Sequence, residues 1–136
     1  MPMTSETEKV AAEPGAAAPE ALDGRALAQL LAEVAADKGA TDLTLIEIGK
    51  LVSYTDFLLL CTARNERMVA AIADEARLRL KQQTAILPRG ADGDADSGWR
   101  VMDYLDCVLH IFTAEARERF QLDELWREAP RVELGD

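Results

Sequence analysis

The chain has few of the residues that usually perform catalysis. It contains one histidine, His110, and two cysteines, Cys61 and Cys107. A zinc site needs three or four ligands, and an activated nucleophile needs a base beside it, so this inventory favours neither. No glycine-rich phosphate loop is present, and residues 51–53 do not form a Gly-Ser turn. The sequence therefore predicts no catalytic centre, no bound cofactor and no metal site.

Basic residues are also scarce. The chain has 15 Lys and Arg against 25 Asp and Glu, which gives a net charge of −10 at pH 7. A protein that binds phosphate backbones needs an excess of positive charge, so no direct nucleic-acid partner is expected. An acidic chain suits a basic protein partner, or the acidity serves solubility alone.

Long apolar runs are missing as well. No run of 18 apolar residues exists, and no basic segment followed by an apolar one opens the chain, so neither a membrane span nor a secretory signal is expected. Cys61 and Cys107 lie inside apolar strand-like runs, which predicts small core residues rather than a disulfide. We expect a protein of the reducing cytoplasm.

Residues 1–21 differ in composition from the rest. They hold three prolines, many alanines and four acids against the single Lys9, and Val10 is their only β-branched aliphatic residue. Such a segment cannot bury enough apolar surface to offset its ordering entropy, which predicts a flexible acidic tail. Residues 22–136 are long enough for one domain with a full core.

That domain alternates between helical and extended patterns. The spacing predicts helices over residues 22–39, over 65–81 with Asn65 as the cap, over 113–120 with Thr113 as the cap, and after a cap at Asp123. Strands are predicted over residues 42–48, 56–62, 99–102 and 107–112, with a weaker one over 85–88 and a loop over 91–98. This order predicts an α/β or α+β fold with a mixed sheet of about five strands flanked by helices. The residues expected in its core include Leu58, Leu60, Ile72 and Val108.

The acidic segment over residues 92–96 has carboxylates at alternate positions, like a calcium loop. The sixth position of such a loop is glycine, but Ser97 stands here, and the twelfth is a bidentate glutamate, but Asp103 stands here. The segment is therefore interpreted as a solvated loop. His110 follows Cys107 by three residues, so strand alternation places them on opposite faces and predicts a hydrogen-bonded strand histidine.

Aromatic residues make up only 5% of the chain, and two of them share a short stretch with two acids. Tyr104 lies between Asp103 and Asp106, and Trp99 precedes Asp103 by four positions. The acids are three residues apart, whereas a metal-binding pair of a nucleotidyl transferase lies at alternate strand positions. The four residues suit a protein-docking surface, in which the aromatics anchor and the carboxylates attract a basic partner. They equally suit two core aromatics with acids that cap turns.

A series of short motifs occurs in a fixed order and spacing between about residues 43 and 130. They are Ser53-Tyr54-Thr55-Asp56-Phe57, Asn65-Glu66-Arg67, Ala70–Glu75, Gly98-Trp99, Asp103-Tyr104, Asp106, His110-Ile111-Phe112, Arg117 and Leu122–Trp126. In these motifs the sequence resembles the ribosomal silencing factor family, also called the iojap family. It departs from the family pattern at Thr62-Ala63 and at Phe120-Gln121.

The resemblance implies a nucleotidyltransferase-like fold without the catalytic residues. It further implies a translational repressor that binds the large ribosomal subunit through its basic ribosomal protein number fourteen and sterically blocks joining of the small subunit under nutrient limitation. It also implies a homodimer, which is common among family members. It favours the docking interpretation, so Trp99, Asp103, Tyr104 and Asp106 are expected to bind the partner. The alternative is a nucleotidyltransferase-like enzyme or nucleotide-binding protein.

Overall fold

One six-stranded sheet organises the structure, a computed structural model that describes residues 23–94 and 97–134. The strand order is β3-β4-β5-β2-β1-β6, with β2 and β5 parallel and every other neighbouring pair antiparallel. The predicted mixed sheet is confirmed, with one strand more than expected. The strands are β1 (Thr41–Glu47), β2 (Phe57–Ala63), β3 (Gly90–Asp94), β4 (Trp99–Asp103), β5 (Cys107–Thr113) and β6 (Arg131–Val132).

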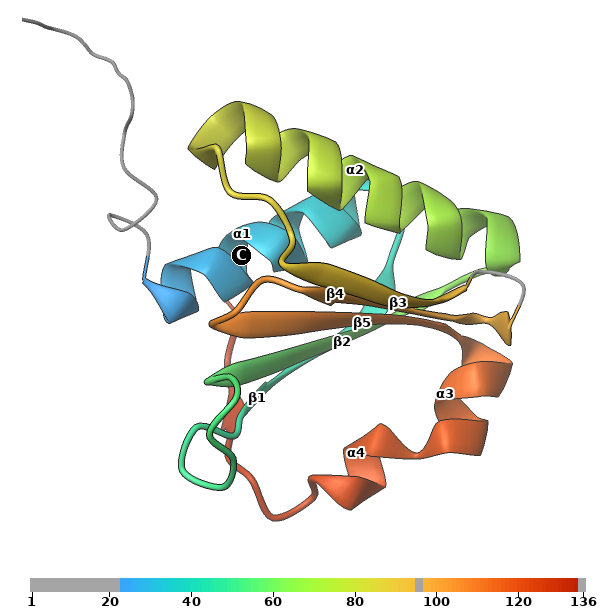
Figure 1. The fold of residues 1–136 in the computed structure, drawn as a ribbon. Helices are drawn as coiled ribbons and strands as arrows, with labels where there is room; N and C mark the ends of the chain where they lie inside the picture. The colour runs from blue at the N-terminus through green and yellow to red at the C-terminus, as the bar shows by residue number, and fades with distance from the viewer. Residues whose placement is uncertain (1–22, 95–96, 135–136) are drawn as a thin grey trace, which may run out of the picture.

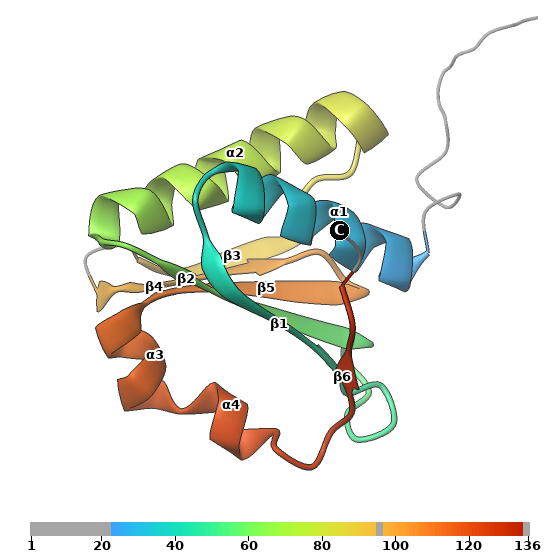
Figure 2. The ribbon, with the colours of Figure 1, turned by 180° about the vertical axis from the view of Figure 1, so that it is seen from behind.

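Helices cover the two faces of the sheet unequally. The two long helices, α1 (Gly24–Asp37) and α2 (Glu66–Thr84), lie side by side on one face, and the short helices α3 (Ala114–Phe120) and α4 (Leu122–Leu125) lie on the other (Figures 1 and 2). No helix in the described ranges is long and apolar enough to cross a membrane. The predicted tail over residues 1–21 lies outside the described residues.

Local sequence explains the central elements. All seven residues of β2 are buried, because this strand lies between two neighbours and is covered on both faces. Asn65 caps α2 as predicted, since its side-chain oxygen accepts a hydrogen bond of 2.9 Å from the amide of Met68. Thr113 likewise caps α3 through the amide of Ala116. These caps fix where the chain turns from the parallel strands into the helices.

Apolar residues form a cluster on each side of the sheet. Ile72 belongs to the cluster under α1 and α2, whereas Leu58, Leu60 and Val108 belong to the cluster under α3 and α4, so all four are buried as predicted. Cys61 and Cys107 are buried free cysteines, which confirms them as small core residues. Burial raises the pKa of the Cys61 thiol to about 12, so this group stays protonated at neutral pH.

The sequence interpretation is wrong around the acidic segment. Residues 85–88 form no strand, because Ala85 takes a left-handed conformation with φ of 65° that ends α2. The edge strand is instead β3, which pairs with β4 from Gly90 opposite Asp103 to Asp94 opposite Trp99. Its sequence GADGD has no apolar alternation, so only pairing with β4 defines it as a strand. The predicted loop is therefore a strand in its first half.

The exposed edge of β3 is poorly suited to further strand pairing. Gly93 has a φ of 73°, and a Cβ there would collide with the Trp99 carbonyl oxygen, so this position requires glycine. The Gly93 amide donates to the Asp92 carboxylate at 3.2 Å and is thus already bonded. A left-handed residue, a bonded amide and a charged side chain together blunt the edge.

Candidate docking face

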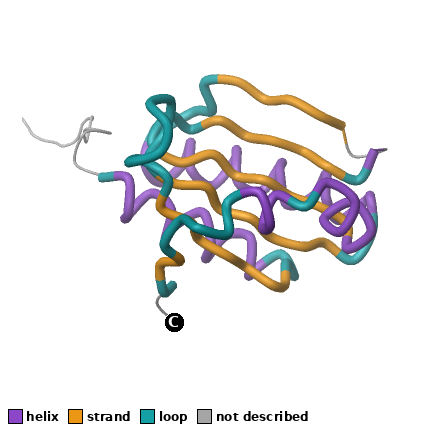
Figure 3. Tube along the Cα trace, turned by 90° about the horizontal axis from the view of Figure 1, so that it is seen from below, coloured by secondary structure: helices purple, strands orange, loops and turns teal. Residues whose placement is uncertain are grey.

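On the side of α3 and α4, part of the sheet has no helix over it. Seen from below in Figure 3, α3 and α4 cross the middle of the sheet, whereas β3 and β4, the two strands at the top of the view, have no helix in front of them. Trp99, Val101 and Asp103 alternate along β4 and pair with Phe112, His110 and Val108 of β5. We call the side chains of Tyr54, Trp99, Val101, Asp103, Val108 and His110 the Trp99 face. A hollow of about 360 Å³ lies against five of them, and only Trp99 is outside its lining.

Trp99 is held by aromatic contacts on this face. Its ring centroid lies 5.5 Å from that of Phe112 and 4.5 Å from that of Phe120. Its indole Nε1 donates a hydrogen bond of 3.1 Å to Nδ1 of His110, which confirms the predicted hydrogen-bonded strand histidine. Burial lowers the pKa of His110 to about 4, so the imidazole is neutral and its Nδ1 remains an acceptor.

Asp103 bonds to the turn that follows β4. One carboxylate oxygen accepts from the amide of Leu105 at 2.8 Å, and the other forms an ion pair of 3.1 Å with Arg89. Asp106, at the far end of the same turn, is half-buried, and its carbonyl oxygen accepts from the amides of Asp56 and Phe57. Asp103 through its side chain and Asp106 through its backbone carbonyl therefore help to hold the turn in place. Asp103 also faces the open side of the sheet.

Tyr104 occupies a different environment from Trp99. It is 4% exposed and packs in the cluster under α1 and α2, on the other side of the sheet. Its hydroxyl has no hydrogen-bond partner among the described residues, and burial raises its pKa to about 12. Trp99 therefore lies on the α3 and α4 side of the sheet, and Tyr104 lies on the α1 and α2 side. Tyr104 is a core residue under the turn.

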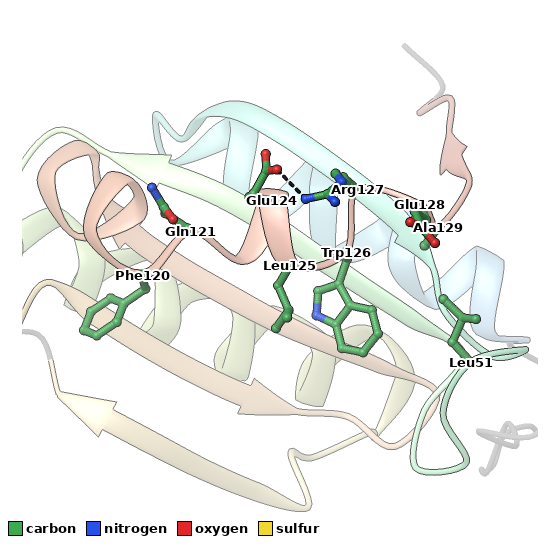
Figure 4. A pocket seen from close by; sticks show the side chains of 9 residues that line it. All are labelled: Leu51, Phe120, Gln121, Glu124, Leu125, Trp126, Arg127, Glu128 and Ala129. Carbon is green, nitrogen blue, oxygen red and sulfur yellow. Dashed lines mark hydrogen bonds and ion pairs between the residues drawn. The ribbon is translucent and has the colours of Figure 1, made fainter.

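A second surface on this side was not predicted. Figure 4 shows Phe120, Leu125 and Trp126 pointing to one side of the C-terminal segment, whereas Gln121, Glu124 and Arg127 point to the other. Leu51, from the β1–β2 connection, joins them around a hollow of about 640 Å³. The sequence held one signal for it. Four apolar residues within positions 120–126 are more than a single helical turn can bury on one face.

Arg117 fastens this C-terminal segment to the sheet. Its guanidinium pairs with both oxygens of Asp123 at 2.9 Å, and its remaining donors reach the Asp42 carbonyl and the hydroxyls of Thr44 and Thr62 at 2.6–2.9 Å. The prediction that Asp123 caps a helix is wrong. Asp123 lies within α4, and the hydrogen bond from Arg117 lowers its pKa.

Together, the Trp99 face and this second surface carry residue types that suit protein recognition. They combine a partly buried tryptophan, exposed aliphatic residues and carboxylates, a mixture typical of surfaces where apolar anchors and charge complementarity act together. Within the described residues, no three His, Cys, Asp or Glu side chains gather in a way that could hold a metal ion.

The chain matches one protein-family model over most of its length. The family model described as "Ribosomal silencing factor during starvation" matches residues 21–136. This chain belongs to the ribosomal silencing factor family. The family is named for a regulatory role on the ribosome and not for an enzymatic reaction, so the expected family and the regulatory class are confirmed.

Individual members of the family match most of this chain. The ribosomal silencing factor RsfS of Halalkalibacterium halodurans is 30% identical over 113 residues, which cover 83% of this chain and 96% of that protein. RsfS of Haemophilus influenzae is 31% identical over 74% of this chain and 98% of its own. The chloroplastic protein Iojap of Zea mays is 31% identical over 76% of this chain, but over 45% of its own length.

Solved structures share the fold. A crystal structure of a Bacillus halodurans protein, 30% identical, superposes with a TM-score of 0.69 over 81% of this chain and 99% of its own. An X-ray structure of a Chromobacterium violaceum protein superposes with a TM-score of 0.73 over 84% of this chain and 93% of its own. At 21% identity, that second similarity concerns the fold alone.

Proposed function

We propose that this ribosomal silencing factor represses translation by binding the large ribosomal subunit through its basic ribosomal protein number fourteen. The bound protein then blocks joining of the small subunit, which lowers translation under nutrient limitation. The observation that carries the proposal is a sheet face without a helix in front of it, on which Trp99 and Asp103 lie, in a family member whose net charge is −10.

The four predicted contact residues divide into three roles. Trp99 supplies apolar contact area, and its ring contacts hold it in one orientation, so little side-chain entropy is lost on binding. Asp103 supplies negative charge on the Trp99 face, and Asp106, whose Cβ lies beside Gly24 of α1, supplies it at the other end of the turn; both charges attract a basic surface. Tyr104 acts from the core, where its ring supports the turn that presents both acids.

Steric occlusion requires no catalytic chemistry. A protein bound at the surface of the large subunit that faces the small subunit prevents joining for as long as it stays bound. The extent of repression then follows from the affinities of two competing partners for one surface. If the protein forms the homodimer expected for the family, dimerisation competes with binding wherever the two surfaces overlap.

Sedimentation tests the proposal directly. Purified protein is mixed with isolated bacterial large subunits, with small subunits, and with isolated protein number fourteen, each in a separate run. Binding is expected to the large subunit and to protein number fourteen but not to the small subunit. Joined ribosomes formed after mixing both subunits should decrease as the protein is added. Equal sedimentation with both subunits, or undiminished joining at saturation, would refute the mechanism.

A further inference from the structure

The C-terminal segment presents apolar side chains to solvent on the same side of the molecule as the Trp99 face. We call Leu51, Phe120, Leu125 and Trp126 the C-terminal trough. Leu125 is 67% exposed, Leu51 58% and Phe120 40%. Single exposed leucines are ordinary, but a cluster around one hollow, rimmed by polar residues, is typical of interaction sites.

Hydrogen bonds from two arginines hold the C-terminal part of the trough in place. Besides the Arg117 bonds, Arg131 donates to the carbonyls of Trp126 at 2.8 Å, Ala129 at 3.1 Å and Asp123 at 3.0 Å. Two arginines therefore bind the backbone and side chains of this short segment to the sheet and to itself. The exposed apolar groups cannot readily collapse inward, and a partner that contacts them has little chain ordering left to impose.

The trough is continuous with the Trp99 face. The Phe120 ring lies 4.5 Å from Trp99, so one surface begins where the other ends. Trp126 and Trp99 also pack against the same buried cluster, which fixes their relative positions. A partner seated on Trp99 would therefore meet Phe120 next and reach Leu125 beyond it.

We propose that the C-terminal trough is the apolar half of the docking surface and receives apolar side chains of the same basic ribosomal protein whose positive groups face Asp103. The proposal rests on the function proposed above and extends its site to four residues outside the predicted set. In this arrangement apolar contact and electrostatic attraction come from different parts of the docking surface. The trough supplies buried apolar area, and the Asp103 carboxylate of the neighbouring Trp99 face supplies attraction and orientation.

Charge favours a basic partner over a second copy of the chain. Two copies would each bring a net charge of −10 to the contact. The rim of the trough carries Glu124 and Glu128, and Arg127 on the same rim is already paired with Glu124 at 2.6 Å. A symmetric contact would bring this acidic rim against its own copy, whereas a basic protein would complement it.

Two variants and one control test the trough. Leu125→Ser and Leu51→Ser remove apolar groups that are mostly exposed, so folding should be preserved. Leu78→Ser is the matched control, because Leu78 is a helical leucine of similar exposure, 50%, on α2 across the sheet. Each is sedimented with isolated large subunits after its thermal unfolding midpoint is compared with wild type. We expect both trough variants to lose about tenfold in affinity and the control to match wild type.

The outcomes separate this inference from the proposed function. Wild-type protein that fails to sediment with large subunits overturns the function, and the trough proposal with it. Wild-type binding together with unchanged binding by both trough variants overturns the trough alone. Equal loss by Leu78→Ser also overturns it, since the effect would then not be local. Analytical ultracentrifugation tests whether a second copy of the chain occupies the trough instead. A wild-type dimer that Leu125→Ser converts to a monomer, while binding to large subunits is unchanged, assigns the trough to a second copy and refutes the ribosomal partner.

Discussion

The indole of Trp99 and the imidazole of His110 form one hydrogen-bonded pair across β4 and β5. Trp99 Nε1 donates to His110 Nδ1 at 3.1 Å, and the two ring centroids lie 5.9 Å apart. Only an imidazole without a proton on Nδ1 can accept this bond. The neutral state of His110 is therefore part of what holds Trp99 in position on the docking face.

This pairing predicts how stability depends on pH. The pKa of His110 falls from 6.5 in the unfolded chain to about 4 in the folded protein, so the unfolded state binds the proton more readily. Stability should be lost as pH falls from about 6.5 to about 4, by up to ~3 kcal/mol at the lower end. His110→Gln keeps an acceptor for Trp99 but removes the titration. Urea unfolding at several pH values should show the wild-type curve falling relative to this variant, and parallel curves would contradict the assignment.

The buried hydroxyl of Tyr104 predicts a small effect from a conservative change. Because the hydroxyl has no partner among the described residues, Tyr104→Phe removes a desolvated polar group without breaking a bond. We expect unchanged stability or a gain of up to ~1 kcal/mol, with ribosome binding unaffected. Tyr104→Ala should instead lose about 3–5 kcal/mol, because it leaves a cavity under the turn. A loss above ~1 kcal/mol for Tyr104→Phe in chemical denaturation would show that the hydroxyl is bonded after all.

Arg117 should be irreplaceable by lysine. A lysine ammonium has three donors and no planar fork, so it cannot reproduce the bidentate pair with Asp123 together with the bonds to β1 and β2. Arg117→Lys should lose about 2–3 kcal/mol in urea unfolding. The control is Arg127→Lys, whose ion pair with Glu124 joins two side chains that are both about two-thirds exposed, 65% and 64%. That change should stay below ~0.5 kcal/mol. Similar losses for both variants would mean that Arg117 contributes only as a surface charge.

The sequence predicted the parts of the fold that short-range patterns encode. An uninterrupted apolar run marked β2, and Asn65 and Thr113 marked two helix starts, because each of these signals lies within a few residues of its effect. The strand β3 escaped prediction because its sequence is small and acidic, and only its partner β4 makes it a strand. The partners of Arg117 lie up to 75 positions away along the chain, so no local pattern could reveal them.

The sequence indicated which residue types form the candidate site, but the prediction did not assign each side chain to a face of the sheet. Trp99 and Tyr104 stood out equally as aromatics beside acids, yet one faces the open side of the sheet and the other the helices. Residues of one strand that are an even number of positions apart lie on the same face. Tyr104, just past the end of β4, follows Trp99 by five positions, so the two side chains point to opposite sides. Leu51 and Leu125 come from distant elements, and only the fold brings them together.

The carboxylate of Asp103 should act on how fast the partner binds more than on how stable the protein is. Asp103→Asn keeps an oxygen that can accept from the Leu105 amide, so the turn is retained, but it removes a negative charge from the docking face and leaves Arg89 without its ion-pair partner. Association with immobilised large subunits should slow severalfold at low salt, and the difference from wild type should shrink as ionic strength rises, since charges farther apart than about 10 Å are largely screened at 0.1 M. Asp74→Asn is the control, because Asp74 is an exposed acid on α2, across the sheet from the docking face. Association rates measured over a range of salt concentrations distinguish two causes. A slowing that is specific to Asp103→Asn locates the attraction at this face, whereas equal slowing by Asp74→Asn would trace it to net charge alone and remove Asp103 from the docking surface.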